Sequence, residues 1–217
     1  MRILIGFTLL TGLVTGARGQ TSNLPADINP ESLSRLPLVK RADLDDDGKR
    51  IYDMVAAPNK TIPNTGPVAV SMYSPKVAES IQMLNQYLRF HGVLSRRDTE
   101  VAILVAAREF DQQYEWSAHE VAARSVGVDQ PIIDVIKYGK DVAGLSEKDT
   151  LIIRFGRQLF RDHKLDSALF AKAVDLFGRQ GTVEMATVMG DYAMAAIMLT
   201  AADQQLPPDR KPTLPAR

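Results

Sequence analysis

Residues 96–127, RRDTEVAILVAAREFDQQYEWSAHEVAARSVG, carry the pattern that indicates the fold of this chain. Its apolar run VAILVAA, at 101–107, predicts a helix in the centre of the core. Ser95 followed by Asp98 has the spacing of a capping box, which predicts where that helix begins. A second helix is expected from about 113 to 126, ending at Gly127. The stretch therefore predicts two helices joined by a short turn, which is a helical hairpin.

The same stretch carries four polar residues at a regular spacing: Glu100, then Gln112, Glu115 and His119 at steps of 12, 15 and 19. Glu115 and His119 are four residues apart, so they project from one face of a helix. If that face meets Glu100, a histidine and two carboxylates converge in a largely apolar place. Burial raises a carboxylate pKa and a nearby carboxylate supports an imidazolium, so such a cluster can pass a proton near neutral pH. Glu100, Glu115 and His119 are the candidate catalytic residues.

Each of these residues also has an alternative interpretation. Glu115 and His119 could form a solvated pair contributing about 0.2–0.5 kcal/mol. Glu100 could favour the helix dipole, and Trp116 could be a core residue. One histidine and two carboxylates could also bind zinc, iron or manganese, although nothing in the spacing demands a metal. The interpretation as a proton-transfer site is favoured over these alternatives only when the spacing of all four polar residues is considered together.

A weak internal repeat bears on these alternatives. The capping Ser95 and the helix-ending Gly127 recur 51 residues later as Ser146 and Gly178. The second copy has Leu151, His163, Asp166 and Phe170 at the four positions, so it lacks the complete polar set. The hairpin architecture by itself therefore does not require the complete set.

The rest of the chain continues the helical pattern. Further helices are expected at about 45–57, 75–92, 130–139, 147–162, 166–177 and 182–203, with a proline-rich loop at 58–67. No useful alternation of apolar and polar residues predicts a strand. The fold class is therefore all-α, with a domain at 44–208, an extended arm at 20–43 before it, and a proline-containing tail at 209–217.

Composition limits the possible functions. The 217 residues, 45% hydrophobic and 24% charged, suffice for one domain with a sizeable core. The formal net charge is zero and the basic residues are dispersed, so no nucleic acid is expected as a partner. The chain has no cysteine, which excludes disulfides, thiolate nucleophiles and thiol peroxidase chemistry.

The first 19 residues, MRILIGFTLLTGLVTGARG, have the pattern of a signal peptide. An apolar run follows Arg2, and Ala17-Arg18-Gly19 fits a cleavage site that leaves Gln20 as the new N-terminus. The alternative is an uncleaved anchor. Removing this segment takes away two arginines and leaves 24 bases against 26 acids, a net charge of −2. We expect a periplasmic or secreted protein that no longer contacts the membrane after cleavage; Asn59 begins a glycosylation sequon of unknown use.

From about Leu44 to Pro208 the chain resembles the carboxymuconolactone decarboxylase-like and AhpD-like superfamily, as a cysteine-lacking member. The resemblance rests on SRRDTEVAIL, on YEWSAHEVAARSVG, and on GDYAMAAIMLTAADQQLPP near the end. The family signature is Glu-x11-Cys-x2-Cys-x3-His, and here Gln112 and Glu115 occupy the two cysteine positions. The resemblance implies an AhpD-like helical bundle built from hairpins, usually a homotrimer or homohexamer, that needs no organic cofactor and no metal.

For function, the resemblance implies a lyase that decarboxylates a small carboxylated lactone or keto acid. By positional match His119 would carry the proton, Glu115 would orient it or share the proton, and Glu100 would complete the relay. An arginine should bind the substrate carboxylate. The candidates for contact with the substrate are Gln112, Trp116, Arg96, Arg97 and Arg108. The alternative is a catalytically silent oligomeric protein that binds a small molecule.

Overall fold

The computed structural model describes residues 24–57 and 61–217, so the expected signal peptide and most of the Asn59 sequon lie outside the described residues. The described part of the chain is all-α, as predicted: it contains eight α-helices, no strand, and one isolated bridge between Asn29 and Ser34. The helices are α1 (Asp46–Ala56), α2 (Pro67–Ser71), α3 (Pro75–Phe90), α4 (Arg96–Glu109), α5 (Gln113–Ser125), α6 (Gln130–Lys137), α7 (Glu147–Arg157) and α8 (Ser167–Ala201).

Local signals explain most helix boundaries. The side chain of Ser95 accepts a hydrogen bond from the backbone N–H of Asp98, and Ser146 does the same for Asp149. A single helix was expected at 147–162. In the structure its α-helical part is α7, which ends at Arg157, and a π-helical turn, Gln158–Asp162, follows. The two helices expected at 166–177 and 182–203 are the two halves of α8, interrupted at Gly178, whose φ of 70° and ψ of 173° are not helical.

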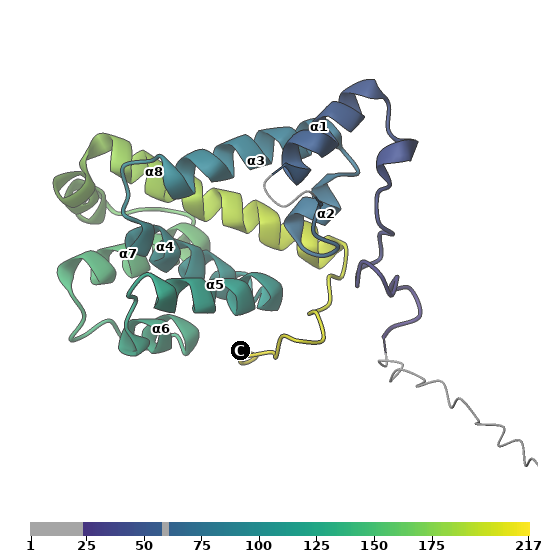
Figure 1. The fold of residues 1–217 in the computed structure, drawn as a ribbon. Helices are drawn as coiled ribbons and strands as arrows, with labels where there is room; N and C mark the ends of the chain where they lie inside the picture. The colour runs from purple at the N-terminus through teal and green to yellow at the C-terminus, as the bar shows by residue number, and fades with distance from the viewer. Residues whose placement is uncertain (1–23, 58–60) are drawn as a thin grey trace, which may run out of the picture.

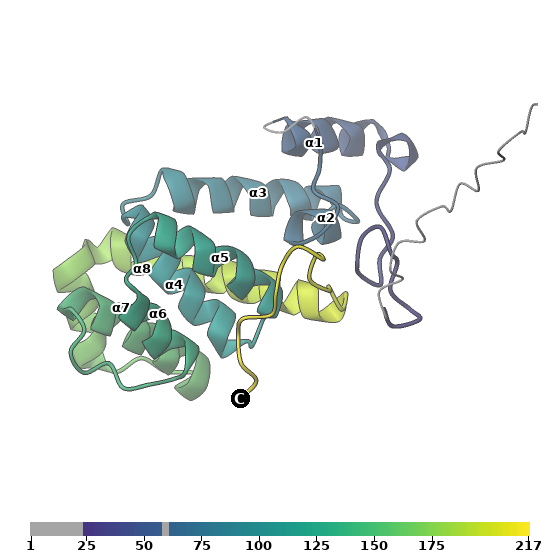
Figure 2. The same ribbon diagram turned by 60° about the horizontal axis from the view of Figure 1, so that its bottom comes forward.

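Helix α4 is the centre of the bundle. Every residue from Asp98 to Arg108 is buried, and the helix contacts α5, α6, α7 and α8. Figure 1 shows α3 and α8 running side by side on one side of this helix, with α5, α6 and α7 on the other. Turned by 60°, the same arrangement shows α1 and α2 gathered at one end of α3 (Figure 2).

The helices enclose two separate hydrophobic cores. The larger core is built on α4 and includes Trp116, Ile133, Phe155 and Met189. The smaller core joins α1, α2 and α3 through four buried side chains, namely Ile51, Val55, Met72 and Ala78. The seam between the two cores is the place where the candidate site lies.

The ends of the described chain lie along the bundle. In the arm, the backbone N–H of Arg35 donates to the carbonyl of Ala202 at 2.8 Å. Residues 203–217, here called the C-terminal strap, leave α8 and run along α5 (Figure 1). Thr213 donates to Glu120 on α5 at 2.6 Å, and Leu214 is buried in the larger core. The strap is therefore a packed part of the domain.

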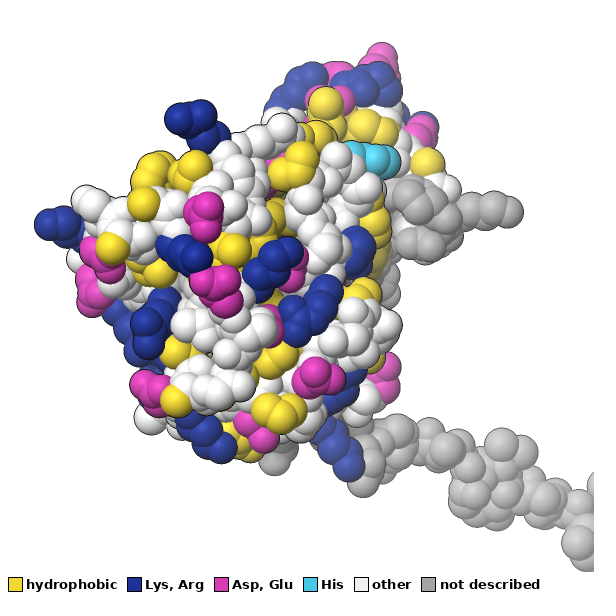
Figure 3. All heavy atoms as spheres, turned by 90° about the vertical axis from the view of Figure 1, so that its left-hand side faces the viewer, with side chains coloured by type: hydrophobic (Ala, Val, Ile, Leu, Met, Phe, Trp, Pro, Cys, Tyr) yellow, Lys and Arg dark blue, Asp and Glu magenta, His cyan; other side chains and the backbone are white. Residues whose placement is uncertain are grey.

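On the face seen in Figure 3, the surface is neither predominantly basic nor predominantly acidic, because side chains of both charges lie among hydrophobic ones. That agrees with the balanced charge of the sequence. Among the described residues, no helix combines the length and the apolar character needed to span a bilayer.

Candidate functional site

The hairpin of α4 and α5 brings Glu100 and His119 into direct contact. Glu100 is fully buried, and its Oε2 lies 2.6 Å from His119 Nδ1. Its other oxygen accepts from Arg96 at 3.2 Å and from Arg89 at 3.4 Å. Burial acts to raise the Glu100 pKa, but the hydrogen bond from His119 and the charges of His119 and the two arginines outweigh it and hold that pKa below its usual range. Glu100 is therefore an ionised carboxylate that orients the imidazole.

Glu115 lies on the opposite side of the same imidazole ring. Its Oε2 is 3.6 Å from His119 Nε2, and its Oε1 is buried without a hydrogen-bond partner. Burial raises the Glu115 pKa, and the neighbouring Asp191 raises it further, while His119, Arg89 and Arg210 act in the opposite direction. The two carboxylates therefore differ: Glu100 is held ionised and Glu115 favours its protonated form.

This geometry also bears on the metal interpretation. Glu100 contacts Nδ1 and Glu115 faces Nε2, so the two carboxylates do not converge with one ring nitrogen on a common point. Within residues 24–57 and 61–217, no group of three histidine, aspartate or glutamate side chains has the arrangement of a metal site.

Glu115 and His119 line a cavity of about 270 Å³ in the seam between the two cores. Its apolar wall comes from α1, α2, α3 and α8, with side chains including Val55, Val68, Ile81 and Ala195. Its polar lining is Gln82, Asn85, Gln86, Arg89, Asp191, Tyr192 and Arg210. A cavity with an apolar wall and a few convergent polar groups is the usual form of a small-molecule site.

Tyr192 completes the surroundings of the imidazole. Its ring meets the His119 ring edge-to-face, with centroids 4.8 Å apart. Burial raises the Tyr192 pKa, so the hydroxyl stays protonated, and Asn85 lies within 3.4 Å of its oxygen. The phenol can therefore act as a neutral hydrogen-bond donor.

Two of the residues proposed for substrate contact do not line this cavity. Gln112 caps α5 by accepting from the backbone N–H of Tyr114, and its amide donates to Thr200 on α8 at 3.0 Å. Trp116 is fully buried in the larger core, where its Nε1 donates to Glu120 at 3.0 Å. Both side chains hold α5 in place and lie outside the cavity lining.

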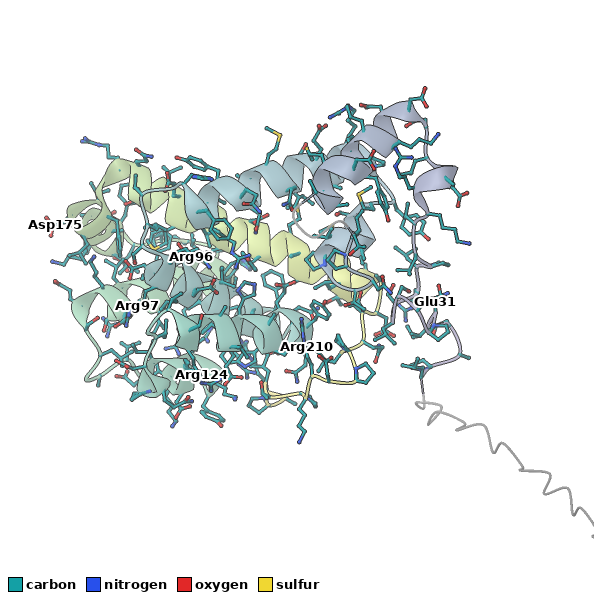
Figure 4. The ribbon with its side chains drawn as sticks, in the orientation of Figure 1. Glu31, Arg96, Arg97, Arg124, Asp175 and Arg210 are labelled. Atoms are coloured by element: carbon teal, nitrogen blue, oxygen red, sulfur yellow. The ribbon has the colours of Figure 1, made fainter. Side chains whose placement is uncertain are left out.

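The three arginines proposed for carboxylate binding are engaged elsewhere. Arg96 bonds to Glu100 and lies over the Phe90 ring. Arg97 pairs with Asp149 at 2.8 Å, and Arg108 donates to the carbonyl of Pro215 at 2.7 Å. None of the three lines the cavity, whereas Arg210 does. Figure 4 labels Arg210 on the C-terminal strap, away from Arg96 and Arg97.

Sequence reasoning missed the polar lining from α3 and from the strap. The helix expected at 75–92 carries polar residues at helical spacing, namely Gln82, Asn85, Gln86 and Arg89. This polar stripe could have indicated that one face of the helix lines a polar cavity or contacts solvent. Arg210 has no local signal, because it sits in a proline-rich tail whose position depends on contacts with α5.

Comparisons with solved structures agree with the fold. An uncharacterised peroxidase-related protein from Silicibacter sp. TM1040 is 16% identical, with a TM-score of 0.65, covering 88% of this chain and 97% of that one. An AhpD-core, peroxidase-related protein from Ralstonia eutropha JMP134 is 17% identical, with a TM-score of 0.64, covering 82% and 94%. The debrominase Bmp8, as a variant in complex with 2,3,4-tribromopyrrole, is 12% identical, with a TM-score of 0.60, covering 79% and 91%.

No protein-family model and no curated protein matches the sequence. The chain has the AhpD-like fold, as its resemblance to that superfamily implied, but without any cysteine.

Proposed function

We propose that this protein is a lyase that decarboxylates a small carboxylated lactone or keto acid by proton transfer at His119, without a cofactor. The observation that carries the proposal is the pair of unlike carboxylates on the two nitrogens of one imidazole, at the wall of an apolar cavity. Pairs of carboxyl groups whose surroundings push their pKa values apart are typical of acid–base sites.

The proposed roles follow from the protonation states. Ionised Glu100 accepts a hydrogen bond from Nδ1–H, so Nε2 is the nitrogen next to Glu115, and both His119 and Glu115 line the cavity. The substrate carboxylate leaves as carbon dioxide, and its bonding electron pair delocalises onto the adjacent carbonyl oxygen. The Tyr192 hydroxyl can stabilise that oxygen by a hydrogen bond. A proton from Glu115 or from the imidazolium then reaches the carbon, and solvent restores the proton.

This assignment redistributes the roles expected from the sequence. Glu115 was expected to orient His119 and Glu100 to complete the relay. The contacts instead favour Glu100 as the orienting carboxylate and Glu115 as the residue that holds a transferable proton. His119 remains between them.

The test is carbon dioxide release from a panel of carboxylated lactones and β-keto acids in chelator-treated buffer. We expect turnover by the wild type and a loss of about 10² or more in His119→Gln. His91→Gln is the matched control, because His91 is an exposed histidine at the end of α3. Equal rates for His119→Gln and the wild type would contradict the proposal.

The second candidate function is binding of a small molecule without turnover. It is favoured by the three buried polar atoms at the cavity that have no partner, on Glu115, Arg89 and Arg210. This function predicts saturable binding, no product, and the same affinity in His119→Gln and the wild type.

A further inference from the structure

Three residues that line the cavity each carry a buried polar atom that the protein itself does not satisfy. Nε of Arg89 and Nη1 of Arg210 are buried donors without an acceptor, and Oε1 of Glu115 is a buried acceptor without a donor. All three residues line the cavity. Buried polar groups in folded proteins are nearly always hydrogen-bonded, so three such atoms on residues that line one cavity point to a ligand with complementary groups.

The charges identify the kind of group that the two arginines can bind. Among the described residues, Arg210 forms no ion pair; its guanidinium lies 5.0 Å from the centre of the Tyr114 ring. Arg89 shares the Glu100 carboxylate with Arg96 at 3.4 Å, which leaves its Nε free. Arg89, Arg210 and Glu115 all line the cavity, and the charges of both arginines lower the Glu115 pKa. Among the described residues, Glu115 forms its ion-pair contact with His119 and pairs with neither arginine.

We propose that Arg89 and Arg210 together bind the carboxylate of the ligand, with its apolar body against the wall formed by α1, α2 and α8. Guanidinium groups are the side chains best suited to carboxylates, because their planar donors match the two oxygens. The inference rests on the proposed function for the chemistry that follows binding, and it replaces Arg96, Arg97 and Arg108 as candidates for this role.

The C-terminal strap is part of this site, since it carries Arg210. Its position is held on α5 by the bond from Thr213 to Glu120 and by two bonds of 2.8 and 3.2 Å between Leu214 and Gln113. Arg210 comes from the strap and Arg89 from α3, so the ligand would join two segments that are far apart in the sequence.

The experiment measures binding separately from turnover, by calorimetry on the His119→Gln background. The probes are 5-oxotetrahydrofuran-2-carboxylate and the corresponding carboxamide, which has the same shape and no charge. We expect the acid to bind at least about tenfold more tightly than the amide. Arg210→Gln and Arg89→Gln should each remove most of that preference, and Arg210→Lys should restore part of it.

Arg179→Gln is the matched control, because Arg179 is an exposed arginine on α8 with no side-chain bond to other described residues. Thermal unfolding of each variant checks that the fold persists. Equal affinity for acid and amide, absence of binding by the acid, or unchanged affinity in Arg210→Gln would overturn the inference. If the acid binds as expected but the wild type releases no carbon dioxide, the proposed lyase fails while the carboxylate site stands.

Discussion

At the scale of single residues, the site depends on how two glutamates of the same hairpin differ. Glu100 has three hydrogen-bond donors around it, whereas Glu115 has one unpartnered oxygen and a neighbouring aspartate. The same side chain is therefore ionised at one position and favours the proton at the other. Stability measurements can test this difference without any substrate.

Replacing Glu115 by glutamine should make stability less dependent on pH. Because the folded-state pKa of Glu115 is raised above 4.5, its favourable contribution is complete in acid and is lost as the pH rises through the raised value. An ionised, unpartnered oxygen there costs about 1–3 kcal/mol. Urea unfolding from about pH 5 to about pH 8 should show the variant gaining stability relative to the wild type. A gap that stays constant across this range would show that Glu115 does not titrate there.

Replacing Glu100 by glutamine should have the opposite pH profile. The Glu100 pKa is lowered, so its contribution is present above 4.5 and is lost as the pH falls through the lower folded-state value. At neutral pH the variant should lose about 1.5–3 kcal/mol of unfolding free energy, the range for hydrogen bonds to charged groups. Glu79→Gln, which removes a surface pair with Arg50, should cost less than about 1 kcal/mol. Equal losses in the two variants would argue against a buried, ionised Glu100.

At the scale of elements, close packing of α7 and α8 on α4 positions the hairpin. Gly156 on α7 faces Val105 on α4, and a Cβ at that glycine would lie 2.5 Å from Val105 Cγ1 and 3.0 Å from Met189 Cε on α8. Valine is stiff, so the helices would have to separate. The absent side chain thus allows three helices to meet closely.

Gly156→Ala should therefore destabilise the protein by about 1–3 kcal/mol, the usual cost of overpacking. Alanine is otherwise favoured over glycine inside a helix by about 0.5–1 kcal/mol. Gly190→Ala, on an exposed position of α8 with no atom within 4 Å of the added Cβ, should show that gain. Thermal and urea unfolding of the two variants measures the change in stability of each. A Gly156→Ala variant more stable than the wild type would contradict the packing argument.

At the scale of the whole molecule, we propose that α3 contributes to contacts between copies of the chain. Its outer face exposes Met83, Leu84, Tyr87 and Phe90, and Met83 is 65% exposed. Several apolar side chains on one surface of a helix are typical of an interaction face. A homotrimer or homohexamer is the assembly that the family resemblance implies.

Met83→Glu should shift such an assembly towards the monomer in sedimentation equilibrium, while the far-ultraviolet circular dichroism stays unchanged. The physical reason is that a carboxylate in an apolar interface must lose its hydration. Lys76→Glu on the same helix is a control for charge alone, because Lys76 is exposed and forms surface pairs with Asp47 and Glu79. A wild type that sediments as a monomer would remove the proposal.

Sequence patterns predicted the hairpin and every helix except the short α2, because the causes of those elements are local. The serine cap at Ser95, the apolar run at 101–107 and the glycine at Gly127 act within a few residues of the boundaries they define. The spacing of Glu115 and His119 likewise placed them on one face of one helix, and Glu100 could be expected opposite them.

Only the tertiary structure decided which side chains share the cavity and what each carboxylate does. Gln112 belongs to the same spacing as the site and Trp116 adjoins Glu115 in the sequence, yet their partners on α8 and α5 hold them outside the lining. Arg210 reaches the cavity because the strap is bound to α5 more than 80 residues away in the chain. The pKa of a carboxyl group depends on its burial and on the charges around it, and every neighbouring element contributes to both. The protonation states of Glu100 and Glu115 therefore depend on α3, α8 and the strap as well as on their own hairpin.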